Sequence, residues 1–532
     1  MPLPRRRSRS DVLLAVGTLV CTLAFAAAVP YSAGGSPKPV IVTPLDHFPS
    51  GDTPQTTPAP VPRADCGPGS NPETGQYQGQ VTVADRESGR SAQGYWCNME
   101  LVGVYGPDDP QGFEGAEWQF ARYRDRRGHN CAYYSQRLFG AGRNGAPLTQ
   151  ERRGTIVVDV SDPVDPKFAG NLFTMGMMDP WESLKVHRGR GLLTAVNVMD
   201  GQGVAYMGVY DLRDDCRHPK KLFDGAVPTI LNHEGNISGD GKTYYSGGVQ
   251  PGIVSAVDLA DPTRPRLLGQ FFAKHIIHGM ATSPDGNRLF LAHMQDDIFQ
   301  TYARSGRGDV QTLTGGEGMG IYDISEIQRR NPNPEVRLIS ALEWTDGQNG
   351  QQPIPVTKDG KPYVIFVDEA GHGGARIIDI SDETKPWVVS KIKTEIMMPE
   401  QYKLAERETS RPGKEDRGGF WLGYNFHYCN VDTQTDPTML ACSAAQSGLR
   451  LIDIRDFSHP KEIGYFNPGG DGTLQPGSWG GVYSGYPSAM PQFDPERRHL
   501  WFSDQDRGVY IIKPTNGAWL STATEETVSD GN

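Results

Sequence analysis

The chain has 532 residues, a formal net charge of −11 at pH 7, 64 glycines and 41 prolines. Nucleic acids and anionic lipids require a clustered positive surface, so this acidic chain is not predicted to bind either as its main partner. High glycine and proline contents with few long amphipathic segments favour an all-β domain.

The first residues have the pattern of a targeting segment. Four arginines between positions 5 and 9 precede an uncharged apolar run, Val12 to Val29, and alanines at 26–28 provide a cleavage site. The apolar run is long for a signal peptide, so residues 1–29 are predicted to be either a signal peptide or a signal anchor that inserts residues 12–29 into the membrane. Both alternatives predict a secreted or cell-envelope protein, which contacts a membrane only through this anchor.

Two further segments are predicted to have no fold of their own. Residues 30–65 are rich in proline and threonine and lack apolar periodicity, which is typical of a flexible linker. Residues 515–532 are predicted to be a disordered tail. The folded domain is therefore expected within residues 78–514.

This domain is organised by a short motif of two aliphatic residues, Asp, an aliphatic residue, and Asp or Ser, with a proline soon after in most copies. One copy is IVVDVSDP at Ile156 to Pro163. Self-similarity at periods of tens of residues indicates an array of identical supersecondary units. The aspartates of the six copies are Asp159, Asp211, Asp258, Asp323, Asp379 and Asp453, and a weaker seventh copy has Ile511 in that position.

Each copy predicts a strand, a tight turn and a second strand. A further pair of strands, joined by an Asp-Gly or Asp-Pro turn, precedes most copies, so each unit holds four antiparallel strands, A to D. Seven such units predict a seven-bladed β-propeller. The first blade is predicted at Gln93 to Phe173, with Asn98 to Tyr105 as strand A and an insertion from Gly106 to Asn130. An N-terminal strand, Gln78 to Arg86, is predicted to complete the last blade, since closure removes two exposed edges.

The motif resembles the LVIVD repeat, and the resemblance extends over roughly Gln78 to Pro514. It implies a β-propeller of the kind found in secreted and surface proteins. It implies no particular activity, because most members of that family have none assigned.

Six cysteines remain once Cys21 in the leader is set aside, and an even number in an exported protein predicts disulfides. Two pairs would join consecutive strands A and B of one blade at matched distances from their turn, and the third pair is what remains. The predicted pairs are Cys97 with Cys131, Cys429 with Cys442, and Cys66 with Cys216.

Function is expected on the face formed by the D-A and B-C connections. Three insertions fall there, at residues 293–318, 391–422 and 469–484, and polar side chains end several B strands. The opposite face consists of the repetitive C-D turns. The candidate binding residues are Glu234, Asp368, Glu369, His372 and Asp504.

Three histidines at the start of strand A form the main candidate site. His233 and His278 each stand seven residues before the Asp of an Asp-Gly turn, which places them at equivalent positions in adjacent blades. His427 has a similar position in blade six, whereas His187 is out of register. Converging imidazoles are ligands for zinc, copper or iron, with Glu234, Asp368, Glu369 or His372 as further ligands. The alternative is that these histidines hydrogen-bond neighbouring backbone and hold the blades together.

Two functions remain open from the sequence. The first is an exported module that binds a protein, glycan or small-molecule partner on the elaborated face. The second is a metal-dependent enzyme, an oxidoreductase or a hydrolase, working at the channel mouth through the three histidines.

Overall fold

The computed structural model divides the chain into two units, Met1–Lys38 and Pro39–Asn532, and only the second contains described residues. The predicted targeting segment and most of the linker lie outside the described residues. These comprise residues 42–43, 59–106, 118–136, 153–198, 206–231, 233–248, 252–273, 275–294, 317–370, 373–409, 423–470, 487–505 and 508–531.

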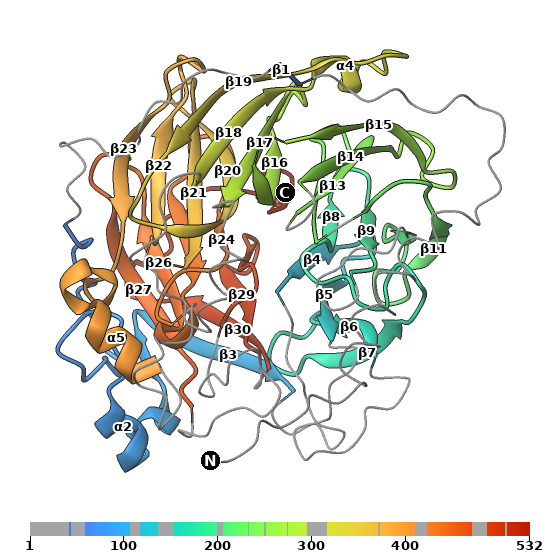
Figure 1. Cartoon of the computed structure of the whole chain (residues 1–532). Helices are drawn as coiled ribbons and strands as arrows, with labels where there is room; N and C mark the ends of the chain where they lie inside the picture. Colours follow the sequence, from blue (N-terminus) through green and yellow to red (C-terminus); the bar gives the residue numbers. More distant parts are fainter. Residues whose placement is uncertain are drawn as a thin grey trace, which may run out of the picture. The chain divides into compact units, whose positions relative to one another are not determined.

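Seven sheets, built mostly from strands that are consecutive in sequence, form a ring in the second unit, and the axis of this ring is called the channel below (Figure 1). Blade 1 holds β4 (Phe120–Arg124), β5 (Asn130–Gln136), β6 (Gly154–Asp159) and β7 (Lys167–Leu172). Blade 2 holds β8 (Lys185–His187), β9 (Leu192–Val196), β10 (Tyr206–Asp211) and β11 (Lys220–Ala226). Blade 3 holds β12 (Glu234–Ile237), β13 (Thr243–Gly247), β14 (Ile253–Asp258) and β15 (Arg266–Phe272).

The remaining blades continue the same order. Blade 4 holds β16 (Ile276–Thr282), β17 (Arg288–Met294), β18 (Gly318–Asp323) and β19 (Val336–Glu343), with β1 (Val42–Thr43) added in parallel at its edge. Blade 5 holds β20 (Gln348–Lys358), β21 (Lys361–Ala370), β22 (Ala375–Asp379) and β23 (Trp387–Ile392). Blade 6 holds β24 (Cys429–Val431), β25 (Met439–Ser443), β26 (Leu449–Asp453) and β27 (Lys461–Asn467), with β2 (Tyr95–Cys97) at its edge. Blade 7 holds β28 (Gln492–Asp494), β29 (His499–Ser503), β30 (Val509–Pro514) and β3 (Met99–Tyr105). The predicted seven-bladed propeller of four-stranded antiparallel blades is therefore confirmed.

The ring is closed by an N-terminal strand, as predicted, but the strand is a different one. β3 pairs with β30 and supplies the fourth strand of blade 7. The predicted closing segment, Gln78 to Arg86, instead enters helix α2 (Val83–Ser88), because Thr82 caps the first turn and Gly89 ends the helix in a left-handed conformation. The first blade accordingly starts at β4, inside the stretch predicted as an insertion.

Two predicted disulfides are wrong for the same reason. Cys97 lies in β2, which pairs with β27 at the edge of blade 6. Cys131 lies in β5 of blade 1, which pairs with β4 and β6. The pair on adjacent strands of blade 6 is confirmed. The disulfides are Cys66–Cys97, Cys131–Cys216 and Cys429–Cys442.

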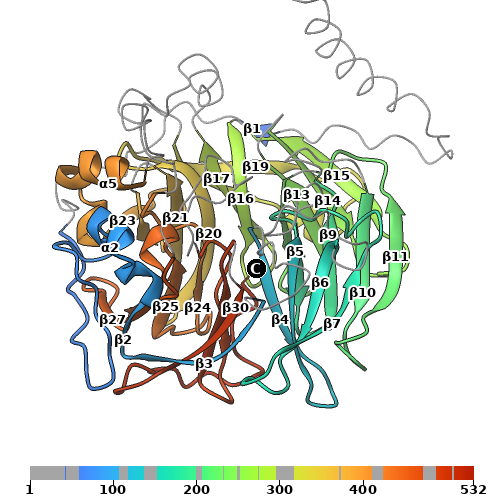
Figure 2. The same cartoon turned by 90° about the horizontal axis from the view of Figure 1, so that it is seen from below.

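Helices are short and lie outside the blades. α2 and α5 (Tyr402–Thr409) lie side by side near blade 6 (Figure 2), where Arg86 donates a hydrogen bond to the Glu408 carbonyl. Within the described residues, none of the helices is long and apolar enough to span a membrane. Besides α2 and α5, the helices of the described residues are η2 (Arg90–Gln93), α4 (Ser325–Gln328), η5 (Glu395–Met397), η6 (Pro399–Gln401) and η7 (Ala445–Ser447).

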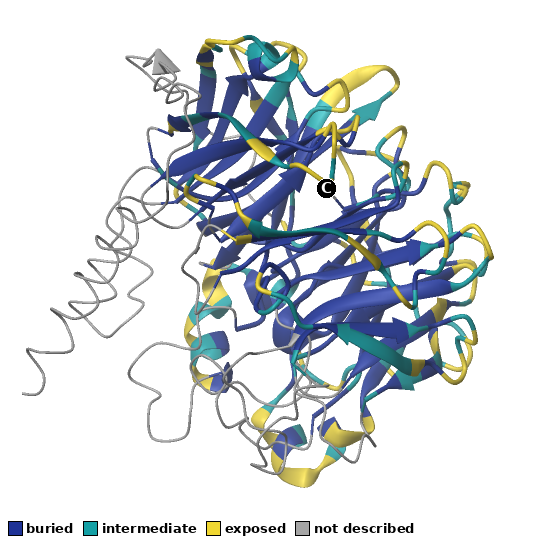
Figure 3. Ribbon diagram, turned by 90° about the vertical axis from the view of Figure 1, so that its right-hand side faces the viewer, coloured by how far each residue is buried: buried dark blue, intermediate teal, exposed yellow. Residues whose placement is uncertain are grey.

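The core lies between the blades, so the inner strands are buried on both faces. All residues of β14 and β18 are buried, whereas the outer strand β11 is exposed or intermediate along its length. Figure 3 shows the same gradient, with exposed residues concentrated in the connecting turns. The aliphatic side chains on both faces of strand C, such as those of Val254, Ala256 and Val257 in β14, therefore reflect packing against two neighbouring blades.

The structure explains the repeated aspartate. In each of the six motif copies its Oδ1 accepts a hydrogen bond from the backbone N–H two residues later, which fixes the turn between strands C and D. The donors are Ser161, Arg213, Ala260, Ser325, Ser381 and Arg455, at 2.8–3.0 Å. In blade 7, β30 has Ile511 instead, and it is paired with β3.

One of these aspartates gives stability that depends on pH. Burial raises the pKa of Asp323, but hydrogen bonds from Arg337 and Ser325 outweigh it and lower the pKa to about 2. A carboxyl group with a lowered folded-state pKa stabilises the protein at neutral pH and loses that contribution as the pH falls from about 4 to about 2. We expect Asp323→Asn to reduce the free energy of unfolding by about 1–2 kcal/mol at pH 7, after allowing for solvent screening.

Urea unfolding of both proteins at pH 7 and pH 3 checks this expectation. The difference between them shrinks at pH 3 if the carboxylate is responsible. A difference that is independent of pH would show that the side chain acts through its shape alone.

The predicted disorder of residues 515–532 does not hold for residues 515–531. The backbone N–H of Thr515 donates to the carbonyl of Asn98, and Ala518 and Val528 are buried. Apolar residues and charged pairs hold this segment against the ring.

Candidate metal centre

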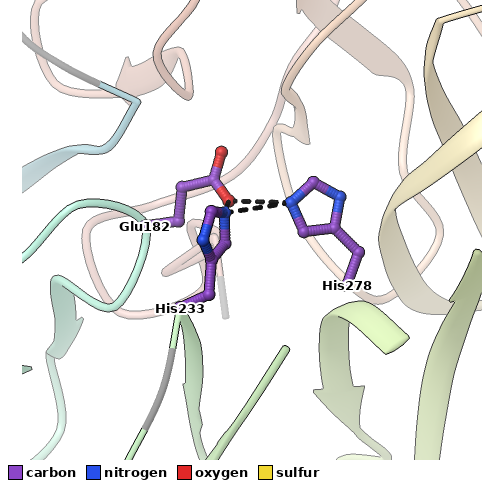
Figure 4. Close-up of side chains that lie close together, drawn as sticks. All are labelled: Glu182, His233 and His278. Carbon is purple, nitrogen blue, oxygen red and sulfur yellow. Dashed lines mark hydrogen bonds and ion pairs between the residues drawn. The ribbon is translucent and has the colours of Figure 1, made fainter. Parts of the chain in front are cut away.

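Three side chains from adjacent blades converge on one another (Figure 4). Glu182 precedes β8, His233 precedes β12 and His278 lies near the start of β16. Each stands six residues before the first residue of the turn that follows its strand A, so the three positions are equivalent in blades 2, 3 and 4. The repeat of the blades thus brings one carboxylate and two imidazoles together.

The Glu182 carboxylate is at the centre of the group. Its Oε2 lies 2.7 Å from Nε2 of His233 and 3.1 Å from Nε2 of His278. The two Nε2 atoms lie 3.1 Å from each other. All three side chains are buried, and they form one of two groups of potential metal ligands among the described residues.

His427 and Glu369 lie on the other side of the same carboxylate. His427 Nε2 is 3.3 Å from Glu182 Oε1 and 3.7 Å from Glu369 Oε1, and His278 Nδ1 is 3.7 Å from Glu369 Oε2. The Nδ1–H of His427 donates to the Ser488 carbonyl at 2.7 Å, so Nε2 is directed toward Glu182. Histidines that ligate metals are commonly oriented by such a bond from the other ring nitrogen.

Electrostatics favour charge in this group even though it is buried. Burial raises the pKa of Glu182, but the facing imidazoles His233 and His278 hold it well below its usual range. Burial lowers the pKa of His278, but the Glu182 carboxylate outweighs this effect and raises it to about 9. At neutral pH the carboxylate is therefore ionised and the His278 imidazole is protonated, so an ion that binds here finds the carboxylate in the form it requires and displaces the proton of the imidazole.

Polar side chains form a second layer around the ligands. Gln351 Nε2 donates to Glu182 Oε1 at 3.2 Å and lies 3.3 Å from Glu234 Oε1. Glu234 also accepts a hydrogen bond from the Tyr428 hydroxyl, and Lys185 Nζ is 3.8 Å from its Oε2. Burial raises the pKa of Glu234 and lowers that of Lys185. This layer fixes the outer oxygens and contains groups able to exchange protons.

Two tryptophans pack against the histidines. The ring centroid of Trp118 is 5.0 Å from that of His427, and the centroid of Trp181 is 5.8 Å from that of His233. The two indole rings are 5.9 Å apart. Trp181 has a left-handed backbone conformation, with φ of 50°, which is a strained geometry for a bulky residue. The apolar wall lowers the local dielectric around the charged group.

The structure brings together only some of the predicted site residues. His233, His278, His427 and Glu369 surround Glu182, and Glu234 lies in the second layer. Asp368 instead pairs with Arg376, and Asp504 accepts a hydrogen bond from Gly508 N–H in blade 7. His372 lies outside the described residues, as do most residues of the three predicted insertions.

Sequence reasoning missed Glu182 and Gln351. Glu182 was detectable, because it has the same spacing to its turn as His233 and His278, but that turn reads Arg-Gly-Arg-Gly and lacks the Asp used as a marker. Gln351 lies at an irregularity in the pairing of β20 with β21, so no spacing could place it.

The second group of potential ligands has a structural role. Asp125 accepts backbone hydrogen bonds from residues 127, 129 and 216, and its Oδ2 lies 2.8 Å from His129 Nδ1. It therefore organises the loops beside the Cys131–Cys216 disulfide.

Comparison with known proteins gives a family match within blade 1. The family model described as LVIVD repeat matches residues 151–174, which contain β6 and β7. No curated protein matches the chain.

Solved structures with similar chains are distant. A putative 6-phosphogluconolactonase from Bacteroides uniformis has 12% identity and a TM-score of 0.42, with 70% of this chain and 88% of that chain covered. A chain of the mitotic checkpoint complex has 9% identity and a TM-score of 0.44, with 78% and 94% covered. The periplasmic gluconolactonase of Pseudomonas aeruginosa has 13% identity and a TM-score of 0.42, with 66% and 86% covered. These likenesses support no statement about the chemistry of this chain.

Proposed function

The chain is a seven-bladed β-propeller that carries the LVIVD repeat, and from this premise we propose that it is a metal-dependent enzyme. Its ion is held by Glu182, His233 and His278 at the channel mouth, with His427 or Glu369 completing the coordination. The observation that carries the proposal is that one carboxylate oxygen and two imidazole nitrogens lie within 2.7–3.1 Å of one another.

These spacings suit a shared ion. Zinc binds imidazole nitrogen and carboxylate oxygen at about 2.0–2.2 Å, so two ligand atoms at a tetrahedral angle are about 3.3–3.6 Å apart. Two of the three separations, at 3.1 Å, approach this range, and the contact of Glu182 with His233, at 2.7 Å, would lengthen by about 0.6 Å or more around an ion. Without an ion, two buried imidazoles direct Nε2 at one oxygen and at each other, an arrangement that needs a specific proton on each contact.

The donor set indicates which ions fit. Nitrogen and oxygen ligands suit zinc, copper and iron, whereas calcium and magnesium prefer oxygen ligands alone. A bound ion of this kind supplies Lewis-acid or redox chemistry, which corresponds to a hydrolase or an oxidoreductase acting on a small molecule. The buried Glu234, Tyr428 and Lys185 are the groups that could hold or move a proton beside it.

We also propose that the protein acts outside the cytoplasm. Three disulfides are typical of proteins from oxidising compartments, and the sequence predicts a targeting segment at residues 1–29. Histidine and carboxylate side chains, unlike cysteine, still bind zinc and copper in an oxidising compartment.

Elemental analysis of protein purified without an affinity histidine tag tests the proposal. We expect close to one equivalent of zinc, copper or iron per chain, and loss of any hydrolytic or oxidative turnover after chelation. Protein that contains no transition metal and takes up none on dialysis would contradict the proposal. It would leave the other function, a module that binds a protein or glycan partner.

A further inference from the structure

The segment after the last strand crosses the ring and ends inside it. Figure 1 and Figure 2 show the C-terminal part of the chain near the middle of the ring. Val528 forms a bridge with Thr433, and the backbone N–H of Ser529 donates to the Asp432 carbonyl. Gly531 packs so closely on Met490 that a Cβ atom would overlap its sulfur. Residues 515–531 therefore reach strands that line the channel.

Two arginines of the channel wall bind acidic side chains of this segment. Arg122, whose side chain is fully buried, lies 2.7 Å from Glu525. The Arg188 side chain lies 3.3 Å from Glu525 and 2.7 Å from Asp530. The backbone N–H of Arg188 also donates a hydrogen bond to the Asp530 carboxylate. Charge-assisted bonds of this kind are stronger than neutral ones.

Arg188 lies at the end of its strand opposite the metal centre, and Arg122 lies within β4, four residues after Trp118. Glu182 precedes β8 and Arg188 follows it. Likewise His427 precedes β24 and Asp432 follows it. Five residues of extended strand separate His427 from Asp432, which corresponds to about 16 Å. The contacts of the segment with Arg188 and Asp432 thus lie at the ends of these strands opposite the ligands, and its last described residue, Gly531, reaches Asn430 inside β24 and Met490.

We infer that residues 515–531 are a plug, docked on a two-arginine surface that fits an acidic peptide, and that this plug closes the channel beneath the metal centre. The docking surface, defined by Arg122 and Arg188, is inferred from their contacts with Glu525 and Asp530 alone. The closing of a path to the metal rests on the proposed function. Ion and substrate then reach the centre from the other end of the channel.

The chain offers a matched test of the docking surface. Glu525→Gln with Asp530→Asn in the full-length protein removes both charges that face the arginines, whereas Glu526→Gln removes the charge of an exposed neighbour. We expect the amide hydrogens of Val528 and Ser529 to exchange at least tenfold faster in the double variant and to change less than twofold in the control. Unchanged exchange in the double variant would overturn the docking.

A second variant keeps the test independent of charge. Gly531 has φ of 74° and no room for a side chain, so Gly531→Leu should displace the end of the segment and raise the same exchange rates. Unchanged exchange in Gly531→Leu would overturn the inference as well, because it would show that the end of the segment is not seated against Met490. A synthetic peptide of residues 515–531 added to the double variant should slow the exchange of Asn430 and Val431, and the peptide with both acidic residues neutralised should not.

Release of zinc from the loaded protein to EDTA tests the closing of the channel. We expect release at least tenfold faster in the double variant and unchanged release in Glu526→Gln. Faster amide exchange without faster zinc release would overturn the plug. If the wild-type chain binds no zinc, copper or iron, the proposed function fails. The exchange of the β8 and β24 amides then still tests the closing of the channel: faster exchange in the double variant supports it, and unchanged exchange overturns it.

Discussion

Replacing both His233 and His278 with alanine lowers the affinity for zinc by a factor on the order of 10⁴. Four protein ligands together give structural zinc sites about 10–16 kcal/mol, which is about 3 kcal/mol, or on the order of 100-fold, for each ligand. The two imidazoles lie 2.7 and 3.1 Å from Glu182 Oε2, so their removal leaves one of the three central ligands. Competition with a chromophoric chelator measures the affinity.

His499→Ala is the matched control, because this buried histidine lies in β29 of blade 7 and is not among the potential ligands. We expect its zinc affinity to stay within about twofold of the wild type, and urea unfolding shows whether each variant is folded. Equal affinities of the folded double variant and the wild type would remove these histidines from the metal site.

Replacing Arg376 with methionine lowers the free energy of unfolding by about 3–5 kcal/mol, because it leaves a buried carboxylate without its partner. Arg376 and Asp368 are both fully buried and form an ion pair. The guanidinium also lies 3.0 Å from Asp346 and 4.0 Å from the centroid of Trp344. Asp346 keeps two lysines in the variant, so Asp368 carries most of the cost.

Urea unfolding of two further variants checks this mechanism. Arg213→Met breaks an ion pair with Asp211 in the equivalent motif of blade 2, but the Arg213 side chain is 45% exposed, so we expect a loss below about 1 kcal/mol. Adding Asp368→Asn to Arg376→Met should recover part of the loss. A double variant that is less stable than Arg376→Met alone would show that packing on Trp344, rather than the orphaned charge, sets the cost.

The fold was predictable because its signal is local and repeated. In six blades strand C ends in an aspartate that accepts a hydrogen bond from the backbone N–H two residues later. The same turn geometry therefore requires the same residue in each of these blades. The closing strand has no such signature. β3 and residues 78–86 are both short and partly apolar, and only pairing with β30 across more than 400 residues distinguishes them.

The candidate site was predictable in part for the same reason. Equal spacing before an Asp-Gly turn identified His233 and His278 as neighbours, and the structure brings them together. Glu182 has the same register but a different turn sequence and a different side chain. Gln351, Trp118 and the arginines beneath the centre depend on long-range packing, which leaves no pattern in the sequence.

Anomalous diffraction at the zinc, copper and iron edges, from crystals of the protein as purified, tests the metal centre most directly. We predict one strong peak with ligand bonds of about 2.0–2.2 Å to the Glu182 carboxylate and to Nε2 of His233 and His278. A peak at any other position, or side chains of these three residues that contact one another with no peak between them after metal loading, would contradict the account.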